Sequence, residues 1–322
     1  MNVVLKNKGW LALKLLVFGL TSFYLYRAVA GRSDWVNLLQ AQAGSRTWIF
    51  VGLAFLLILA NWGLEAWKWW YLARKIETVS FLRAFRSVMV GLTLGFITPN
   101  RVGDYAGRIL ELRSKKRINA IGAIFLGRFA QLVITFLFGS LGGFYLFWHF
   151  YLPEFFWIKV SVGLFVILLN FFGLLLFFRA SLILALFASF RIFRKLVPFL
   201  RVLAQYTFSE LGNTLLLAGI RYVVFCIQFA LLLLAFNVKI SFVAFASCIA
   251  STFLLKSVVP SLSAITDIGM REISAMHFFS MFGQPELNVL SASLGLWFMN
   301  IVFPSAVGLI FVARLKLKKA TD

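Results

Sequence analysis

Residues 85–108, FRSVMVGLTLGFITPNRVGDYAGR, combine an apolar run with a proline, glycines and charged residues. The apolar first part, residues 85–98, closes at Pro99 and is followed by Gly103 and Asp104. Proline ends a helix because it lacks an N–H and its ring collides with the preceding turn, and glycine then frees the backbone. At membrane depth such a break has to be buried in protein or to line a hydrated cavity. The stretch therefore predicts a re-entrant or broken helix, with an ordinary turn of solvated charges as the alternative.

The whole chain has the composition of a membrane protein. Of its 322 residues, 61% are hydrophobic and 17% are aromatic, and the mean hydropathy is +0.91. This apolar fraction is well above that of a globular chain. We therefore expect an all-α, polytopic integral membrane protein with one transmembrane domain over residues 1–322. Six stretches are long enough to cross a bilayer as helices: residues 10–30, 47–67, 118–148, 155–178, 213–236 and 289–313.

A second apolar stretch, residues 241–259, runs into Pro260 in the same way. We interpret it as another broken helix, although a full span over these residues stays open. The two halves, residues 47–148 and 213–313, then share one order of elements: span, broken helix with proline, charged motif, span. This order is typical of transporters built from inverted repeats, in which discontinuous helices form a site near the midplane.

Basic residues set the expected orientation. The chain has 32 Lys and Arg against 11 Asp and Glu, a formal net charge of +21. Short basic segments alternate with the apolar stretches, as in cytoplasmic loops beside anionic headgroups. These segments are Lys6 to Lys8, 68–86, 113–117, 191–201 and 314–319. Both termini are then cytoplasmic, and residues 179–201 include an interfacial helix. Charges divided among short loops do not make a nucleic-acid site.

Two arginines are expected deep in the membrane. Arg128 lies ten residues into its span, and Arg221 is similarly deep. Each costs about 2.5–3.5 kcal/mol on insertion scales, so both need acidic partners or a hydrated cavity. The candidate partners are Asp104, Asp267 and Glu272. A purely structural ion pair is the alternative.

The acidic candidates share a sequence context. The chain has only four Asp, and Asp104 and Asp267 each follow a proline that closes an apolar segment. We expect released amides and nearby guanidinium groups to bind a lipid phosphate, and the carboxylates to balance these cations or receive an amine. The predicted substrate-binding residues are Arg101, Asp104, Arg108, Arg128, Arg221, Asp267, Arg271 and Glu272. The predicted helix-breaking residues are Pro99, Gly103, Pro260 and Gly269.

Other polar residues in the apolar stretches fit simpler roles. Lys256 and His277 are expected at the membrane interface, which a long or amphipathic side chain can reach. Glu65 precedes Lys68 by three residues, which suits a local ion pair at the end of a span. The sequence has no G-x-x-x-x-G-K-[ST] loop and no G-x-S-x-G elbow, and its two histidines lie far apart. We expect no cofactor, no metal site and no enzymatic activity.

The two charged motifs resemble a known family. Asp267 to Glu272, followed by a span with Asn300 and Pro304, is similar to the transmembrane flippase domain of lysylphosphatidylglycerol synthases and its stand-alone relatives. Pro99 to Arg108 resembles that family's Pro-x-Arg-x-Gly-acidic stretch. The resemblance covers residues 45–313. It implies a bacterial cytoplasmic-membrane protein that moves aminoacylated or other phospholipids between leaflets, with broken helices around a lipid-accessible cavity.

The motifs and the resemblance together predict a lipid transporter of the flippase type. An anionic or aminoacylated phospholipid headgroup would enter a polar groove while the acyl chains stay in lipid. Because the chain ends soon after its last expected span, we expect no soluble aminoacyl-transferase domain. Two other classes stay open: a headgroup-modifying enzyme with Asp104 or Glu272 as general base, and a scaffold that tolerates neutralised motif charges. A homo-oligomer is compatible with each.

Overall fold

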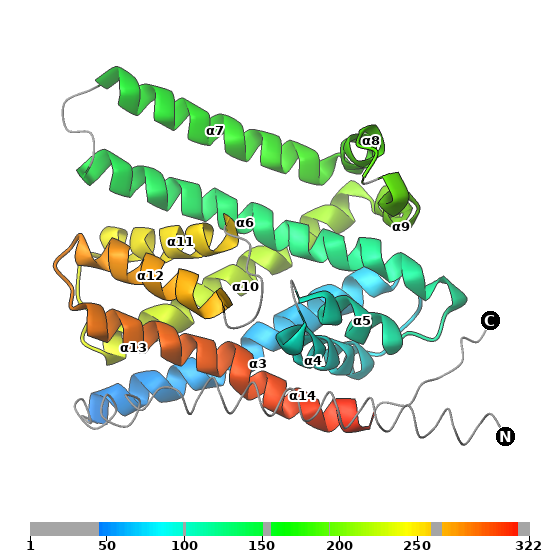
Figure 1. Cartoon of the computed structure of the whole chain (residues 1–322), viewed down its shortest axis with the longest axis horizontal. Helices are drawn as coiled ribbons and strands as arrows, with labels where there is room; N and C mark the ends of the chain where they lie inside the picture. Colours follow the sequence, from blue (N-terminus) through cyan, green and yellow to red (C-terminus); the bar gives the residue numbers. More distant parts are fainter. Residues whose placement is uncertain (1–44, 99–100, 151–155, 193, 259–265, 315–322) are drawn as a thin grey trace.

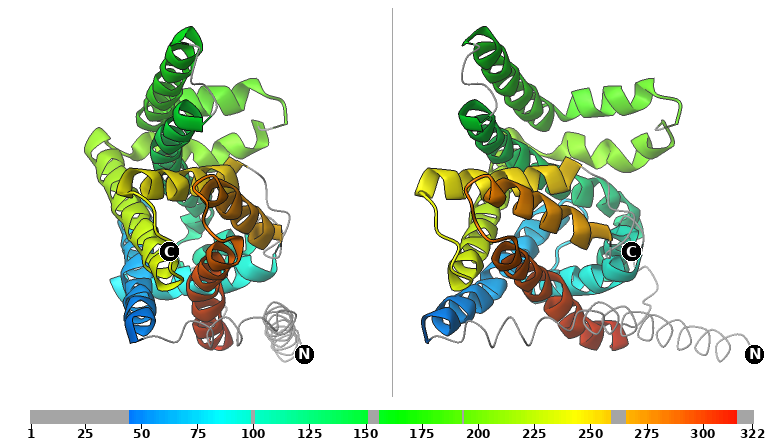
Figure 2. Two further views of the ribbon diagram at one scale, coloured as in Figure 1. Left: turned by 90° about the vertical axis from the view of Figure 1, so that its left-hand side faces the viewer. Right: turned by 60° about the vertical axis from the view of Figure 1, so that its left-hand side comes forward.

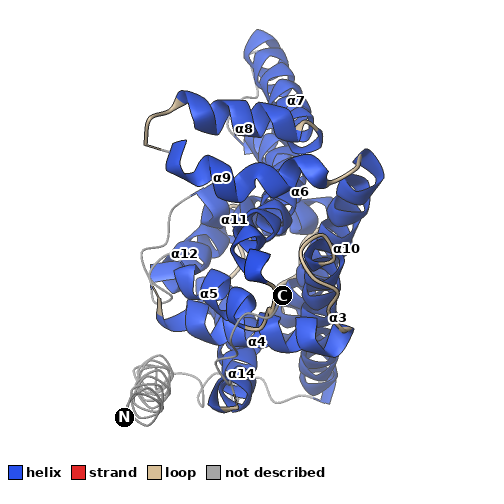
Figure 3. Cartoon of the chain, turned by 90° about the vertical axis from the view of Figure 1, so that its right-hand side faces the viewer, coloured by secondary structure: helices blue, strands red, loops and turns tan. Residues whose placement is uncertain are grey.

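Helices form the part of the chain that the structure describes. The computed structural model describes residues 45–98, 101–150, 156–192, 194–258 and 266–314, and the regular elements in them are all helical (Figure 1). Figure 3 shows helices and loops, without a strand, over these residues. Large apolar side chains such as Trp157 and Phe165 lie on the outer surface, as lipid solvent requires. The prediction of an all-α fold is confirmed.

Five helical runs in the described residues are long and apolar enough to cross a membrane. They are α3 (Ser45–Ala73), α6 (Ala120–Phe150), α7 (Phe156–Phe178), α10 (Phe208–Ala235), and the continuous run of α13 (Glu286–Trp297), the π-helical η5 (Phe298–Val302) and α14 (Phe303–Ala313). These runs correspond to five of the six predicted spans. The sixth, residues 10–30, lies outside the described residues. The chain is a multi-pass membrane protein.

The first broken helix consists of α4 (Phe81–Ile97) and α5 (Val102–Leu110). Pro99 lies outside the described residues. After the break, Arg101 has a left-handed backbone (φ 54°) and directly precedes α5. The chain then returns beside α4 towards the end of the molecule at which α3 stops (Figure 1). α4 and α5 thus form a helical hairpin, in agreement with the broken helix that the sequence predicts.

Glycines allow α4 and α5 to pack closely. A Cβ on Gly107 would lie 2.5 Å from the Cα of Gly91, and a Cβ on Gly103 would collide with the Leu94 carbonyl. Only residues without a side chain let two helix backbones approach this closely. Gly103 lies inside α5 with helical geometry. Its predicted role as a break in the helix is therefore wrong, because what this position requires is space and not backbone freedom.

The second broken helix consists of α11 (Phe242–Val258) and α12 (Thr266–Ser280). Both lie side by side, and α12 returns to the end at which α11 begins (Figure 1). Near this end the side-chain amide of Asn288 donates to the Phe236 carbonyl at 2.8 Å. α11 has 17 residues and is shorter than the five candidate spans, which agrees with the re-entrant interpretation. Pro260 lies outside the described residues, and Gly269 is part of α12 rather than of the break.

The two hairpins enter the molecule from opposite ends. α4 and α5 follow the end of α3, whereas α11 and α12 follow the end of α10, which runs beside α3 in the opposite direction (Figure 1). The packing is reciprocal, because α6 packs on α11 and α14 packs on α4. Both views of Figure 2 place α7 at the outer edge of this bundle. The arrangement agrees with the predicted inverted repeat, which stays a prediction.

The predicted interfacial segment, residues 179–201, contains short helices. These are α8 (Ala180–Ser189), the 3-10 helix η3 (Arg194–Leu196) and α9 (Val197–Leu200). They lie at the end of the molecule where α3 stops and where α4 and α5 enter (Figures 1 and 3). Their position at a membrane surface stays a prediction.

Substituting Gly107 by alanine is expected to destabilise the protein. The added methyl group would push α5 away from Gly91, and such overpacking costs about 1–3 kcal/mol. Thermal unfolding of the purified protein in detergent should move to lower temperature. Gly63→Ala is the matched control, because nothing lies within 4 Å of a Cβ at Gly63. An equal shift for both variants would contradict the close contact between α4 and α5.

Candidate functional site

A polar cavity lies among the two hairpins and the long helices. Its first chamber has a volume of about 420 Å³ and its second chamber a volume of about 220 Å³, and both have Trp62, Arg101 and Arg221 in their walls. The lining residues come from α3, α4, α6, α10, α11 and η5, with α5 added in the first chamber and α12 in the second. Arg221 lies halfway along α10, so the cavity reaches the middle of a candidate span.

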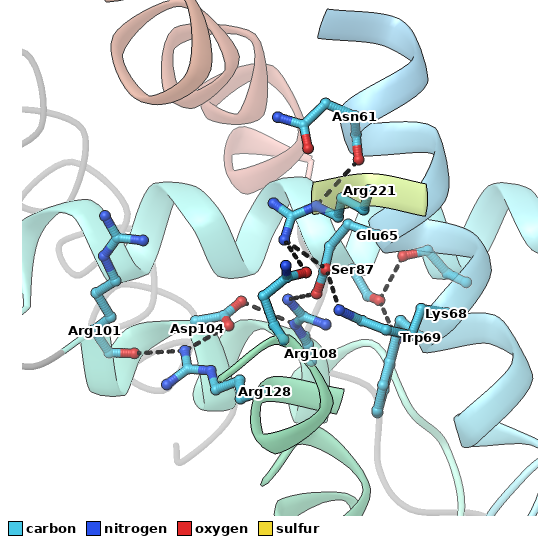
Figure 4. Close-up of polar contacts among 12 residues, drawn as sticks. Asn61, Glu65, Lys68, Trp69, Ser87, Arg101, Asp104, Arg108, Arg128 and Arg221 are labelled. Atoms are coloured by element: carbon cyan, nitrogen blue, oxygen red, sulfur yellow. Dashed lines mark hydrogen bonds and ion pairs between the residues drawn. The ribbon is translucent and has the colours of Figure 1, made fainter. Parts of the chain in front are cut away.

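Glu65 is the central carboxylate of the first chamber. Its Oε2 lies 2.8 Å from Lys68 Nζ and 3.2 Å from Arg221 Nη1. Its Oε1 accepts a hydrogen bond from Arg108 Nη2 at 2.9 Å. One buried carboxylate thus joins α3, α5 and α10, as Figure 4 shows. Because charged hydrogen bonds are the stronger ones, these contacts hold three helices in register.

Asp104 is the second carboxylate of the chamber. Its Oδ1 accepts from Arg108 Nε at 2.9 Å, and its Oδ2 accepts from Arg128 Nη2 at 2.6 Å (Figure 4). Arg108 is therefore held between two carboxylates. Arg128 also lies over the ring of Tyr105, with its Cζ 4.3 Å from the ring centroid. These contacts join α5 to α6.

Neutral amides surround Arg221 on the side of the second chamber. Its Nε donates to the backbone carbonyl of Asn61 and its Nη1 to Gln131 Oε1, both at 3.3 Å. The Asn61 side chain donates to Asn300 Oδ1 at 2.5 Å. Asn300 belongs to the π-helical turn η5, and such turns are frequent at functional sites. Through the hydrogen bond with Asn61 the Asn300 side chain contacts α3.

The second charged motif supplies Arg271 to the wall of the second chamber. Its Nη2 lies 2.7 Å from Glu272 Oε1, and its Nε donates to the Ser293 hydroxyl at 3.0 Å. Glu272 is buried and lines neither chamber. Glu272 therefore positions Arg271 from outside the chamber. The side chain of Asp267 lies outside the described residues.

The structure brings most of the predicted site residues together. Those in the walls of the first chamber are Arg101, Asp104, Arg108, Arg128 and Arg221. The predicted pairing of intramembrane arginines with acids is present at Asp104. For Arg221 the acidic partner is different, because Glu65 takes that place.

Two residues have roles that the sequence reasoning missed. Glu65 does pair with Lys68, as predicted, but it also binds two arginines in the cavity. Its position inside an apolar stretch was the available signal, since an acid there marks a polar pathway. Lys256 lines both chambers, so its predicted interface position is wrong. His277 is exposed at the end of α12, and its interface role stays a prediction.

The cavity can bind a polar group at a depth where the surrounding hydrocarbon offers no hydrogen-bond partners. Arg128 keeps 34% of its side chain exposed, against 7% for Arg108, so Arg128 is open to a ligand while Arg108 is enclosed. In the described part of the chain, no group of three or more His, Cys, Asp or Glu could hold a metal ion. The polar groups in the walls of the cavity are guanidinium, ammonium, carboxylate, amide and hydroxyl groups.

Comparison with known proteins identifies a family. Residues 11–308 match the family model described as lysylphosphatidylglycerol synthase TM region. The match includes both broken helices and all the described residues that line the two chambers. Comparisons with curated proteins and with solved structures gave no match.

Replacing Glu65 by glutamine is expected to destabilise the protein strongly. Three basic groups would lose their shared carboxylate, and breaking a buried ion pair costs about 3–5 kcal/mol. Denaturant unfolding in detergent would measure the loss. The matched control is Glu286→Gln, an exposed position at which we expect a change within about 0.5 kcal/mol. Equal stability of the two variants would show that Glu65 does not organise the cavity.

Proposed function

Because the chain belongs to the lysylphosphatidylglycerol synthase TM region family, we propose that it is a lipid transporter of the flippase type. It moves the headgroup of a phospholipid between the leaflets of the bacterial cytoplasmic membrane while the acyl chains remain in lipid. The family match supports a role in lipid handling. The observation that carries the proposal is the charged cavity within the membrane domain.

The free-energy cost of moving a headgroup through the hydrocarbon core explains why such a cavity is needed. A polar or charged headgroup loses its hydration in the hydrocarbon core, and each unpaired polar group there costs several kcal/mol. Guanidinium groups such as those of Arg128 and Arg221 replace the lost water contacts. A scaffold would have no comparable need for arginines in an open cavity at this depth.

The two hairpins connect the cavity to both ends of the bundle, and therefore to both leaflets. One enters from each end of the bundle, and both contribute to the walls, through Asp104 in the first half and Lys256 in the second (Figure 1). Reciprocal hairpins around a central site are the usual basis of alternating access. We propose that the end with the basic loops, at which α14 stops (Figure 1), faces the cytoplasm, and that both termini are cytoplasmic as the sequence predicts.

We propose no enzymatic role. The two carboxylates considered as a general base are both engaged by arginines, Asp104 by Arg128 at 2.6 Å and Glu272 by Arg271 at 2.7 Å. A general base has to be within reach of a substrate proton and free to accept it. Their geometry suits the positioning of cations better than proton abstraction.

Leaflet exchange of labelled phospholipids in liposomes with purified protein tests the proposal. We expect faster exchange than in protein-free liposomes, and a loss of about tenfold or more for Arg128→Ala, since hydrogen bonds to charged groups contribute about 1.5–3 kcal/mol. Arg201→Ala is the control, because Arg201 is exposed and lies outside the cavity. Unchanged exchange by a folded Arg128→Ala variant would contradict the proposal.

A further inference from the structure

We infer that the cavity selects a headgroup with a net negative charge and discriminates against one that carries an added ammonium group. The favoured ligand is a phosphodiester whose remaining part is neutral and bears hydroxyl groups, as in a phosphoglycerol headgroup. An aminoacylated headgroup is disfavoured. This inference names the substrate class and rests on the proposed function.

The first observation is the charge of the first chamber. Among its described lining residues two are acidic, Glu65 and Asp104, and six are basic. The basic ones are Lys68, Arg101, Arg108, Arg128, Arg221 and Lys256. Arg101 and Lys256 have further interactions, but without them four cations still share the two carboxylates. Since electrostatic interactions are strong where water is scarce, this surplus of cations attracts an anion and repels an ammonium group.

The second observation is that both acids already bind cations. Glu65 contacts Lys68, Arg108 and Arg221, and its side chain is 7% exposed. Asp104 contacts Arg108 and Arg128. An ammonium group could pair with either carboxylate only by displacing an arginine or a lysine, which would leave that cation unpaired.

The accessible ends of the network are cationic. The side chains of Arg128 and Arg221 are 34% and 19% exposed, whereas those of Lys68 and Arg108 are 3% and 7% exposed. The enclosed Lys68 and Arg108 thus neutralise the two carboxylates. The more exposed Arg128 and Arg221 present their guanidinium groups to the cavity. A planar guanidinium group binds phosphate oxygens in a bidentate manner.

The second chamber continues the same chemistry without an acid. No acidic side chain occurs among its described lining residues, and Glu272 lies outside its wall, bound to Arg271. Neutral polar groups fill the gaps between its cations: Asn61, Gln131, Thr135, Tyr222, Ser257 and Asn300. Amides and hydroxyls are suited to the hydroxyl groups of a headgroup and carry no negative charge that would attract an ammonium group.

A headgroup series separates the alternatives. Liposomes with purified protein receive labelled phosphatidylglycerol, phosphatidylethanolamine or lysylphosphatidylglycerol with identical acyl chains and label. We expect phosphatidylglycerol to exchange about tenfold or more faster than the lysylated lipid, because like charges repel in the site. Exchange of the lysylated lipid at an equal or higher rate would overturn the inference while leaving the proposed transport intact.

A substitution inside the cavity tests the cause of the preference. Gln131→Glu adds a carboxylate of the same shape beside Arg221, whose Nη1 contacts Gln131 Oε1 at 3.3 Å. We expect the ratio of the two exchange rates to fall about threefold or more, because the added charge attracts an ammonium group. Arg201→Gln changes charge outside the cavity and should leave the ratio unchanged. An unaltered ratio in a folded Gln131→Glu variant would contradict selection by cavity charge.

Binding distinguishes a failure of the inference from a failure of transport. If no lipid is exchanged, the proposed function fails, and native mass spectrometry of the detergent-solubilised protein with the same lipids tests the site alone. Stronger binding of phosphatidylglycerol, weakened in Arg128→Gln, would support the charge selectivity. Equal or stronger binding of lysylphosphatidylglycerol would overturn it.

Discussion

Arg108 lies between Glu65 of α3 and Asp104 of α5, with a guanidinium nitrogen 2.9 Å from each carboxylate. A cation at this depth is tolerated only with partners, because removing a partner leaves an uncompensated buried charge. Through Glu65 the contacts extend to Lys68 and Arg221, and through Asp104 to Arg128. The network therefore determines how α5 is placed against α3, α6 and α10.

The broken helix and its glycines follow from the same constraint. Asp104 can approach α4 because Gly91 leaves room for its carboxylate, and Gly107 lets α5 lie directly against α4. The hairpin thus carries its charges towards the protein interior and away from lipid. The opposite half also contains a buried ion pair, in which Glu272 binds Arg271, and Arg271 alone lines the second chamber from α12.

The balance of charges connects this architecture to the proposed lipid transport. A membrane protein that needed ion pairs only for stability could match each cation with one acid and leave no cavity. Here four cations share two carboxylates, and two of the four keep exposed surface in the chamber. A bound phosphate would neutralise this surplus of positive charge, because the guanidinium groups are already positioned to bind an anion.

Local signals in the sequence determined the helical membrane class, the spans and the two breaks. Span length and a proline that ends an apolar run are properties of neighbouring residues, so they can be read without the fold. Deep arginines likewise indicate that acidic partners or a cavity must exist. For these reasons Arg101, Asp104, Arg108, Arg128 and Arg221 could be singled out from the chain alone.

Which charged groups pair with one another depends on the folded path of the chain. Glu65 has a local partner in Lys68, which hides its need for Arg108, a residue 43 positions away along the chain. In the sequence Lys256 has the pattern of a lysine that extends to the membrane surface. In the fold α11 packs against α6, and Lys256 lines the cavity. Gly103 shows the same limit, because the Leu94 carbonyl that excludes a side chain there belongs to another helix. Contacts between distant segments depend on the folded path of the chain, which local patterns do not contain.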